Sequence, residues 1–313
     1  MKFIVHIGSE KTGSSSIQQF MHMNKSALAE RGFLYLHNAG RVDYRDIAAF
    51  CLNQGRTDAY LRRKRVNTPS RRAEFDKDFL SDFHRQLGAV TGDIHTVIIS
   101  SEHFSARLRS LKEIERLKRL LSKYSSEVKI VCYIRDQGAK VCSQYSTRIK
   151  TGDKEKFSNY VTAYLHKVEN KDDYSSKFEQ WGKVFGCENL NVRLFDKSFF
   201  DGGTLLSDFV RQLPAGIDEN QLPFPKYKNQ ALSRRGCEWL RRLNYFFPER
   251  VRGYAVVERF REEWLIPSVA LLTKGEGLQL NSEQKALIAQ KFGQSNARAC
   301  AKYFPGRDSL FPK

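Results

Sequence analysis

At 313 residues the chain can bury a large hydrophobic core, either as one elaborated α/β domain or as a domain with a helical cap. Its 53 Lys and Arg against 35 Asp and Glu give a net charge of +18, which favours a nucleotide, an acidic glycan, a nucleic acid or an anionic membrane as partner. No apolar run approaches the roughly 20 residues that span a bilayer, and the opening MKFIVHIG is typical of a strand rather than of a signal peptide. We therefore expect a soluble cytoplasmic protein without a transmembrane segment.

The six cysteines show the pattern of neither a metal site nor a disulfide framework. None belongs to a C-x₂-C pair or stands beside a histidine cluster. We expect them to be reduced residues of the hydrophobic core. They are Cys51, Cys132, Cys142, Cys187, Cys237 and Cys300.

The N-terminal stretch predicts a strand, a loop and a helix in that order. Lys2 to Ile7 is rich in β-branched and aromatic residues, a loop with a glycine at each end runs from Gly8 to Gly13, and a helical pattern opens at Ser14. The first amides of a helix lack partners within it and carry a partial positive charge, so a phosphate can bind there if the preceding side chains are small. Lys11 adds a mobile cation. The stretch therefore predicts an anion site.

This loop has the spacing of a nucleotide P-loop but not its chemistry. Gly8 and Gly13 fit GxxxxGK[ST], yet Ser14 stands where the pattern requires lysine, and the lysine of this loop is Lys11. The P-loop lysine is missing, and there is therefore also no hydroxyl directly after such a lysine to hold Mg²⁺. We expect protein cations to neutralise the phosphates and no metal to be required.

Lys11-Thr12-Gly13-Ser14-Ser15 resembles the loop K-[TS]-G-[TS]-[TS] with which sulfotransferases bind a 5′-phosphosulfate. The resemblance implies that the donor is 3′-phosphoadenylyl sulfate (PAPS). The residues that would bind it here are Lys11, Thr12, Gly13, Ser14, Ser15 and Ser16. Because the motif is short, a simple structural helix cap is the alternative.

The rest of the chain alternates strand and helix patterns and then becomes mostly helical. Further strands are expected at Phe33 to Leu36, His95 to Ser100, Val128 to Ile134 and Asn189 to Phe195. Helices are expected at 16–31, 75–87, 111–123, 157–168, 174–185, 205–213, 231–246, 254–272 and 281–303. This order predicts a P-loop-like three-layer α/β fold with a central parallel sheet and additional C-terminal helices. We expect a single domain over residues 1–313, with the core sheet in about 1–200 and a helical part in about 201–313.

Polar residues follow three of the expected strands. Ligands of open parallel sheets collect beyond the carboxyl ends of the strands. The stretches Gly8 to Ser16, Ser100 to Phe104 and Arg135 to Ser143 should therefore converge on one site.

The third stretch resembles the 3′-phosphate site of sulfotransferases. Arg135 follows a hydrophobic strand, and Ser143 lies eight residues later on the next helix. A planar guanidinium can bind phosphate through two hydrogen bonds and a serine hydroxyl adds a donor. The resemblance implies that both residues bind the 3′-phosphate of PAPS; a salt-bridged arginine and a surface serine are the alternative.

Sulfuryl transfer needs a cation at the leaving oxygen and a base for the acceptor hydroxyl. Lys11 fits the first role. For the second, Glu102 and His103 follow the expected strand 95–100, at the place where sulfotransferases carry a catalytic glutamate or histidine. We expect an extended segment here, with the two side chains pointing in different directions, and favour Glu102 over His103 as the base. A structural acid paired with Arg135 or another arginine remains open for Glu102, and His6 is expected to be a core or loop-supporting histidine.

The acceptor is indicated only by resemblance. The stretches NQALSRRGCEWLRRLN and QSNARACAKYFPGRDSLF are similar to the C-terminal part of bacterial sulfotransferases that act on surface saccharides. This implies a hydroxyl or amine acceptor in a saccharide or glycolipid, for example of a capsular glycan. The basic cluster Arg62 to Arg65 with Arg71 and Arg72 could border the acceptor cleft or form a solvated face.

Two other classes of protein remain open. A P-loop phosphotransferase would need Mg²⁺ and an acid at a strand end, for which Asp136 is the candidate. A basic nucleic-acid-binding protein would agree with the net charge, but the sequence has no RNP, helix-turn-helix or zinc-finger pattern.

Overall fold

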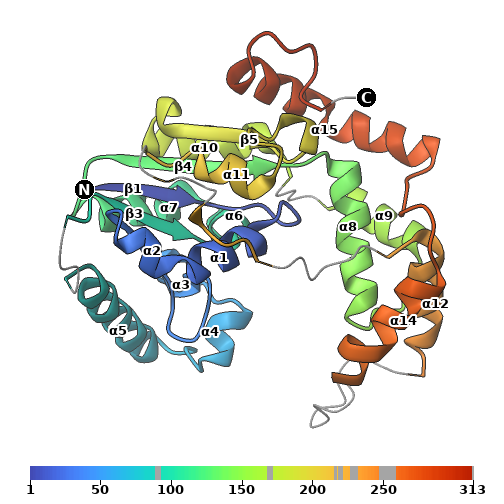
Figure 1. The fold of residues 1–313 in the computed structure, drawn as a ribbon, viewed down its shortest axis with the longest axis horizontal. Coiled ribbons are helices and arrows are strands. Elements are labelled where there is room, and N and C mark those ends of the chain that lie inside the picture. The colour runs from blue at the N-terminus through green and yellow to red at the C-terminus, as the bar shows by residue number, and fades with distance from the viewer. Residues whose placement is uncertain are drawn as a thin grey trace. The chain divides into compact units, whose positions relative to one another are not determined.

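The fold is built on one parallel sheet. A computed structural model describes residues 1–88, 93–167, 172–214, 217, 221–225, 232–246 and 259–311. The strands are β1 (Lys2–His6), β2 (Phe33–Leu36), β3 (Thr96–Ser100), β4 (Val128–Ile134) and β5 (Leu190–Leu194). They form a five-stranded sheet in the order β2-β3-β1-β4-β5, in which every neighbouring pair is parallel (Figure 1). All strands therefore end at the same edge, as the sequence predicts.

The chain divides into two compact units, and the first contains the sheet. This unit comprises residues 1–134 and 174–225. Its helices are α1 (Ser14–Met23), α2 (Lys25–Ala29), α3 (Arg45–Cys51), α4 (Ala59–Arg63), α5 (Pro69–Gly88), α6 (Glu102–Arg107), α7 (Leu111–Leu121), α10 (Tyr174–Phe185) and α11 (Leu205–Val210), with the 3₁₀ turns η1 (Cys187–Asn189) and η2 (Lys197–Phe199).

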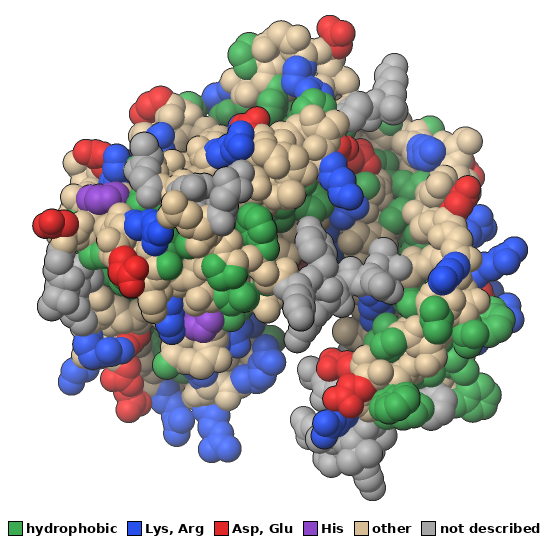
Figure 2. Space-filling view, viewed as in Figure 1, with side chains coloured by type: hydrophobic (Ala, Val, Ile, Leu, Met, Phe, Trp, Pro, Cys, Tyr) green, Lys and Arg blue, Asp and Glu red, His purple; other side chains and the backbone are tan. Residues whose placement is uncertain are grey.

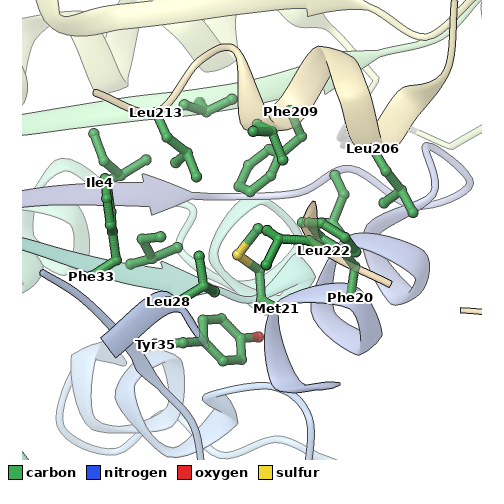
Figure 3. Packing of buried hydrophobic residues seen from close by; sticks show 14 of the residues in the cluster. Ile4, Phe20, Met21, Leu28, Phe33, Tyr35, Leu206, Phe209, Leu213 and Leu222 are labelled. Carbon is green, nitrogen blue, oxygen red and sulfur yellow. The ribbon is translucent and has the colours of Figure 1, made fainter. Parts of the chain in front are cut away.

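Helices cover both faces of this sheet. Figure 3 shows Phe20 and Met21 of α1 and Phe209 of α11 packed with Ile4 and Tyr35 of the sheet. The alternate strand residues point to the other face, where α10 contacts β4 and β5 and packs against α7. The predicted three-layer α/β fold is thus confirmed, and the buried, β-branched strands are those that a sheet covered on both faces requires.

The second unit is helical and comprises residues 135–173 and 226–313. Its helices are α8 (Gln137–Lys150), α9 (Phe157–Leu165), α12 (Arg234–Leu243), the π-helical turn η4 (Arg261–Leu265), α14 (Ile266–Leu272) and α15 (Ser282–Tyr303). Tyr145 of α8, Tyr164 of α9, Leu240 of α12 and Phe292 of α15 belong to one buried cluster. That residues 1–313 act as a single domain stays a prediction.

Three local expectations need correction. The helix expected at 16–31 is two helices, because Asn24 leaves the helical conformation and its side-chain amide donates to the carbonyl oxygen of Phe20. None of the six cysteines, all of which lie in the described ranges, forms a disulfide, but Cys187 is exposed and is no core residue. The expected helix 254–272 begins outside the described residues, and its described part contains η4 before α14.

No helix of the described ranges has both the length and the apolar character needed to cross a membrane.

Candidate active site

The loop between β1 and α1 has the backbone of an anion-binding turn. Gly8, Lys11 and Gly13 have φ angles of 57°, 66° and 73°, so the loop turns through three left-handed residues. Gly13 is the N-cap of α1, and no side chain caps this helix end. The first amides of α1 therefore remain available for an anion.

Two hydroxyls brace the loop from inside. Thr12 is fully buried and its Oγ1 donates to the carbonyl oxygen of Ser9 at 2.8 Å, while the buried Ser14 Oγ donates to the same oxygen at 3.4 Å. Ser15 is exposed, and Lys11 and Ser16 are half-buried. The side chains that a ligand could reach most readily are thus those of Lys11, Ser15 and Ser16.

Close contacts fix both ends of the loop. A Cβ on Gly13 would lie 2.2 Å from Leu205 Cδ2 of α11, and a Cβ on Gly8 would lie 2.8 Å from Glu102 Cα of α6. Only glycine fits either place. The contact at Gly8 brings together two of the three predicted stretches, because Glu102 borders the loop directly.

Glu102 and His103 lie in the first turn of a helix and not on an extended segment, which corrects the expectation. Ser101 is the N-cap of α6, and its Oγ accepts the amide of His103 at 3.4 Å. The Ser101 amide donates to the His6 carbonyl oxygen at 3.1 Å, which ties α6 to the end of β1. The two side chains still diverge, because consecutive helical residues lie about 100° apart.

His103 is directed toward α3 and α4. It lines a small pocket with Arg45, Asp58 and Arg107, and its Nε2 is 3.8 Å from Asp43 Oδ2. Burial, helped by the charge of Arg45, lowers the pKa of His103 to about 4. The imidazole is therefore neutral near pH 7.

The charged groups around His103 were not singled out from the sequence. Arg45 Nη2 and Arg107 Nε lie 3.7 and 3.6 Å from Asp58 Oδ2, beyond hydrogen-bond distance, and both arginine Nε atoms are buried without a hydrogen-bond partner. Asp58 Oδ1 instead accepts two amides as the N-cap of α4. The position of Asp43 and Arg45 after the strand 33–36, at the carboxyl edge, was the available signal.

His6 supports the loop from the core, as expected. It is fully buried, its Nδ1 lies 2.8 Å from Ser100 Oγ, and its ring contacts Tyr133 and Phe209. Burial lowers the pKa of His6 to about 3. The neutral ring links the ends of β1 and β3, from which the loop and α6 start.

Arg135 and Ser143 belong to the second unit. Arg135 follows the last residue of β4 in the chain, and Ser143 lies on α8; both side chains are half-buried. Asp136 is the N-cap of α8, where it accepts the amide of Ala139 at 2.8 Å. This structural role makes Asp136 a weaker candidate for a magnesium ligand.

The basic cluster divides into two parts. Arg62 to Arg65 are exposed at the end of α4. Arg72 is buried, pairs with Asp76, and donates to the carbonyl oxygens at the end of α3. Arg72 therefore holds the fold together and cannot border an acceptor cleft. Across the described ranges, no three or more His, Cys, Asp or Glu side chains gather as a metal site would require.

Comparison with known proteins identifies the fold. No family model matches the chain. An uncharacterized protein of Archaeoglobus fulgidus is 27% identical over 214 residues, which are 66% of this chain and 54% of that protein, so the match spans about half of the relative. The crystal structure of a sulfotransferase from Alicyclobacillus acidocaldarius aligns with a TM-score of 0.50 at 12% identity and covers 97% of this chain and 96% of that one. The chain thus has the fold of a sulfotransferase.

Proposed function

We propose that the chain is a sulfotransferase that moves a sulfuryl group from PAPS to a hydroxyl or amine of an acceptor. The observation that carries the proposal is the contact of Gly8 with Glu102, which sets a candidate base beside an anion-binding loop. The sulfotransferase fold of the chain supports the same reading.

The donor would bind through its 5′-phosphosulfate at the loop. The amides at the start of α1 and the hydroxyls of Ser15 and Ser16 offer donors, and Lys11 offers a charge. Thr12 and Ser14 contribute by holding the loop in shape. Arg135 and Ser143 are proposed to bind the 3′-phosphate, as the sequence resemblance implies.

In the transfer step the acceptor oxygen forms a bond to sulfur while the bond from sulfur to the phosphate oxygen breaks. The electron pair of that bond stays on the phosphate oxygen, where Lys11 would stabilise the developing charge. The acceptor proton passes to the Glu102 carboxylate. The products are the sulfated acceptor and adenosine 3′,5′-bisphosphate.

Glu102 is a better candidate for the base than His103 for two reasons. Glu102 borders the loop at Gly8, whereas His103 faces Arg45 and Asp43. A histidine whose pKa is about 4 is also a weak proton acceptor at neutral pH. His103 would then serve the acceptor side of the site.

The acceptor is proposed to be a saccharide or glycolipid of a surface or capsular glycan. This rests on the resemblance of the C-terminal stretches and on the net charge of +18. Arg45 and Arg107 lie beside His103 together with the acids Asp43 and Asp58, so this part of the site offers both cations and hydrogen-bond acceptors to a saccharide.

The proposal is tested by incubating the chain with PAPS and a pool of bacterial surface glycans in EDTA, with mass spectrometry of the products. Glu102→Gln keeps the size of the side chain and removes the base, so it should lower kcat by about 10²–10⁴ with donor affinity nearly unchanged. His103→Gln should lower kcat much less. Full activity of Glu102→Gln with loss of activity in His103→Gln would assign the base to His103. In a parallel reaction without EDTA, phosphoryl transfer from ATP and Mg²⁺, together with no sulfation from PAPS, would refute the proposal.

A further inference from the structure

The second unit exposes an unusual amount of apolar surface on and beside α12, η4 and α14. Seven large apolar side chains are exposed within residues 239–272, against six scattered over the rest of the described chain. Figure 2 shows such side chains gathered at the lower right, over α12 and α14 of Figure 1. We call them the apolar patch: Trp239, Tyr245, Phe246, Phe260, Trp264, Leu271 and Leu272.

The patch is not explained by packing within its own unit. The inner faces of both helices are already buried, with Leu240 of α12 and Val269 of α14 in the same hydrophobic cluster. Trp239, Trp264 and Phe246 nevertheless remain 54%, 66% and 78% exposed. Contiguous apolar surface of this kind on a folded chain indicates an interaction site.

A rigid frame holds the patch in place. The buried Asn244, at the end of α12, donates to the carbonyl oxygens of Ile149 and Asp153 at 2.9 and 2.7 Å. Arg261 in turn donates to Asn244 Oδ1 at 2.9 Å and to the Lys150 carbonyl oxygen at 3.0 Å. The end of α12 and the turn η4 are therefore fixed to the C-terminus of α8.

The exposed side of α12 alternates cations with aromatic rings. Arg235, Trp239, Arg242 and Phe246 have the spacing i, i+4, i+7 and i+11, which places them on one side of the helix and of the turn that continues it. All four are exposed. α12 contains four arginines and one acid, Glu238, which pairs with Arg241 and Arg242. Tryptophan, phenylalanine and arginine in alternation are typical of helices that lie in the interface of an anionic bilayer.

We propose that α12, with the apolar patch, docks the protein on the surface of an anionic lipid bilayer. The rings would enter the headgroup region while Arg235 and Arg242 bind lipid phosphates. A second copy of the chain fits less well, because a two-fold interface places the same patch of both copies face to face and would bring these cations together. The proposal does not depend on the transfer reaction.

Sedimentation with vesicles tests the proposal. The full chain should pellet with vesicles of phosphatidylcholine and phosphatidylglycerol, much less with phosphatidylcholine alone, and less in high salt. Trp239→Ser combined with Phe246→Ser should weaken binding by about 10-fold or more, because each removes a large apolar side chain from the interface. Arg235→Gln and Arg242→Gln should each weaken binding by about 5-fold, on anionic vesicles only.

Matched controls lie on α15 of the same unit. Leu287→Ser and Lys285→Gln change an exposed apolar and an exposed cationic side chain outside the patch and should leave vesicle binding unchanged. Equal losses in the controls, no binding of the unmodified chain to anionic vesicles, or a dimer in light scattering that Trp239→Ser dissociates would each overturn the proposal. Binding of adenosine 3′,5′-bisphosphate, measured in parallel, reports on the transferase proposal separately.

Discussion

At the scale of single residues, the backbone conformation of Lys11 allows a ligand-binding role of its side chain to be distinguished from a structural role. Lys11 and Arg65 are the two non-glycine residues with positive φ in the described ranges, at 66° and 59°. Side chains rarely adopt this conformation, and holding one there costs on the order of 1 kcal/mol. Because the loop keeps a lysine in this strained conformation, replacing Lys11 by glycine tests the role of its amine.

We predict that Lys11→Gly leaves the melting temperature unchanged or raised but weakens the binding of adenosine 3′,5′-bisphosphate by at least about 10-fold, the loss of one charge-assisted hydrogen bond. Arg65→Gly is the matched control, since it relieves the same strain on an exposed residue and should leave nucleotide binding intact. Calorimetry and nucleotide titration of both variants check this. Equal nucleotide affinity in the two variants would exclude Lys11 from the donor site.

The buried His6 predicts a loss of stability in acid. Burial holds the pKa of His6 at about 3, whereas the unfolded residue has a pKa of 6.5. Between these values the unfolded chain binds one more proton, so the free energy of unfolding falls as the pH falls, by about 1.4 kcal/mol per pH unit from this residue.

His6→Gln removes this contribution. Between about pH 6.5 and about pH 4.5 the unfolding free energy of the variant should fall by on the order of 2 kcal/mol less than that of the unmodified protein. Urea denaturation at both pH values measures the difference. His103, whose pKa is also lowered by burial, contributes to both proteins alike. If the free energy of unfolding fell equally in the two proteins, His6 would be protonated in the folded state.

At the scale of elements, α11 is anchored by one buried carboxylate. Asp208 is fully buried and accepts from Tyr133 of β4, from Arg193 of β5 and from the amide of Asp201 at 2.8 Å. The same helix presses Leu205 against Gly13. The position of the loop therefore depends on this anchor.

Asp208→Asn should lower the free energy of unfolding by about 3 kcal/mol, because it leaves Arg193 without its buried counter-charge. Asp201 pairs with the same arginine, but its side chain is 56% exposed, so Asp201→Asn should cost at most about 1 kcal/mol. Urea denaturation of the two variants makes the comparison. Similar costs for both would mean that Asp208 is not the anchor of α11.

Some helices and strands were predicted correctly from the sequence, and others were not. The bounds of β2, β4 and α10 agree with the sequence prediction because each is a regular apolar pattern with clear ends. The expectation of an extended segment at Glu102 and His103 was wrong, although Ser101 followed by Glu102 has the signature of an N-cap and an acidic first turn. At Asn24 the helical pattern of the sequence continues, but the side-chain amide of Asn24 donates to the backbone carbonyl oxygen of Phe20 and the helix is interrupted.

At the scale of the molecule, topology could be predicted and side-chain clustering could not. Alternating strands and helices predicted the parallel sheet, and the parallel sheet predicted that the loop and Glu102 would meet. The charged surroundings of His103 could not be predicted in this way. Arg45, Asp58 and Arg107 lie in or cap three different helices, and no periodic pattern in the sequence indicates how these helices pack together. That Arg135 and Ser143 bind the 3′-phosphate stays a prediction.

The most direct test of the central claim is calorimetric titration of the chain with adenosine 3′,5′-bisphosphate in EDTA, with adenosine 5′-monophosphate as the matched ligand. The account predicts that the bisphosphate binds without metal and more tightly than the monophosphate, and that Arg135→Ala removes most of this preference, a loss of roughly 1.5–3 kcal/mol per hydrogen bond to the 3′-phosphate. Lys11→Ala should instead weaken both nucleotides. Equal affinity for the two ligands, or binding that requires Mg²⁺ and favours ATP, would contradict the account.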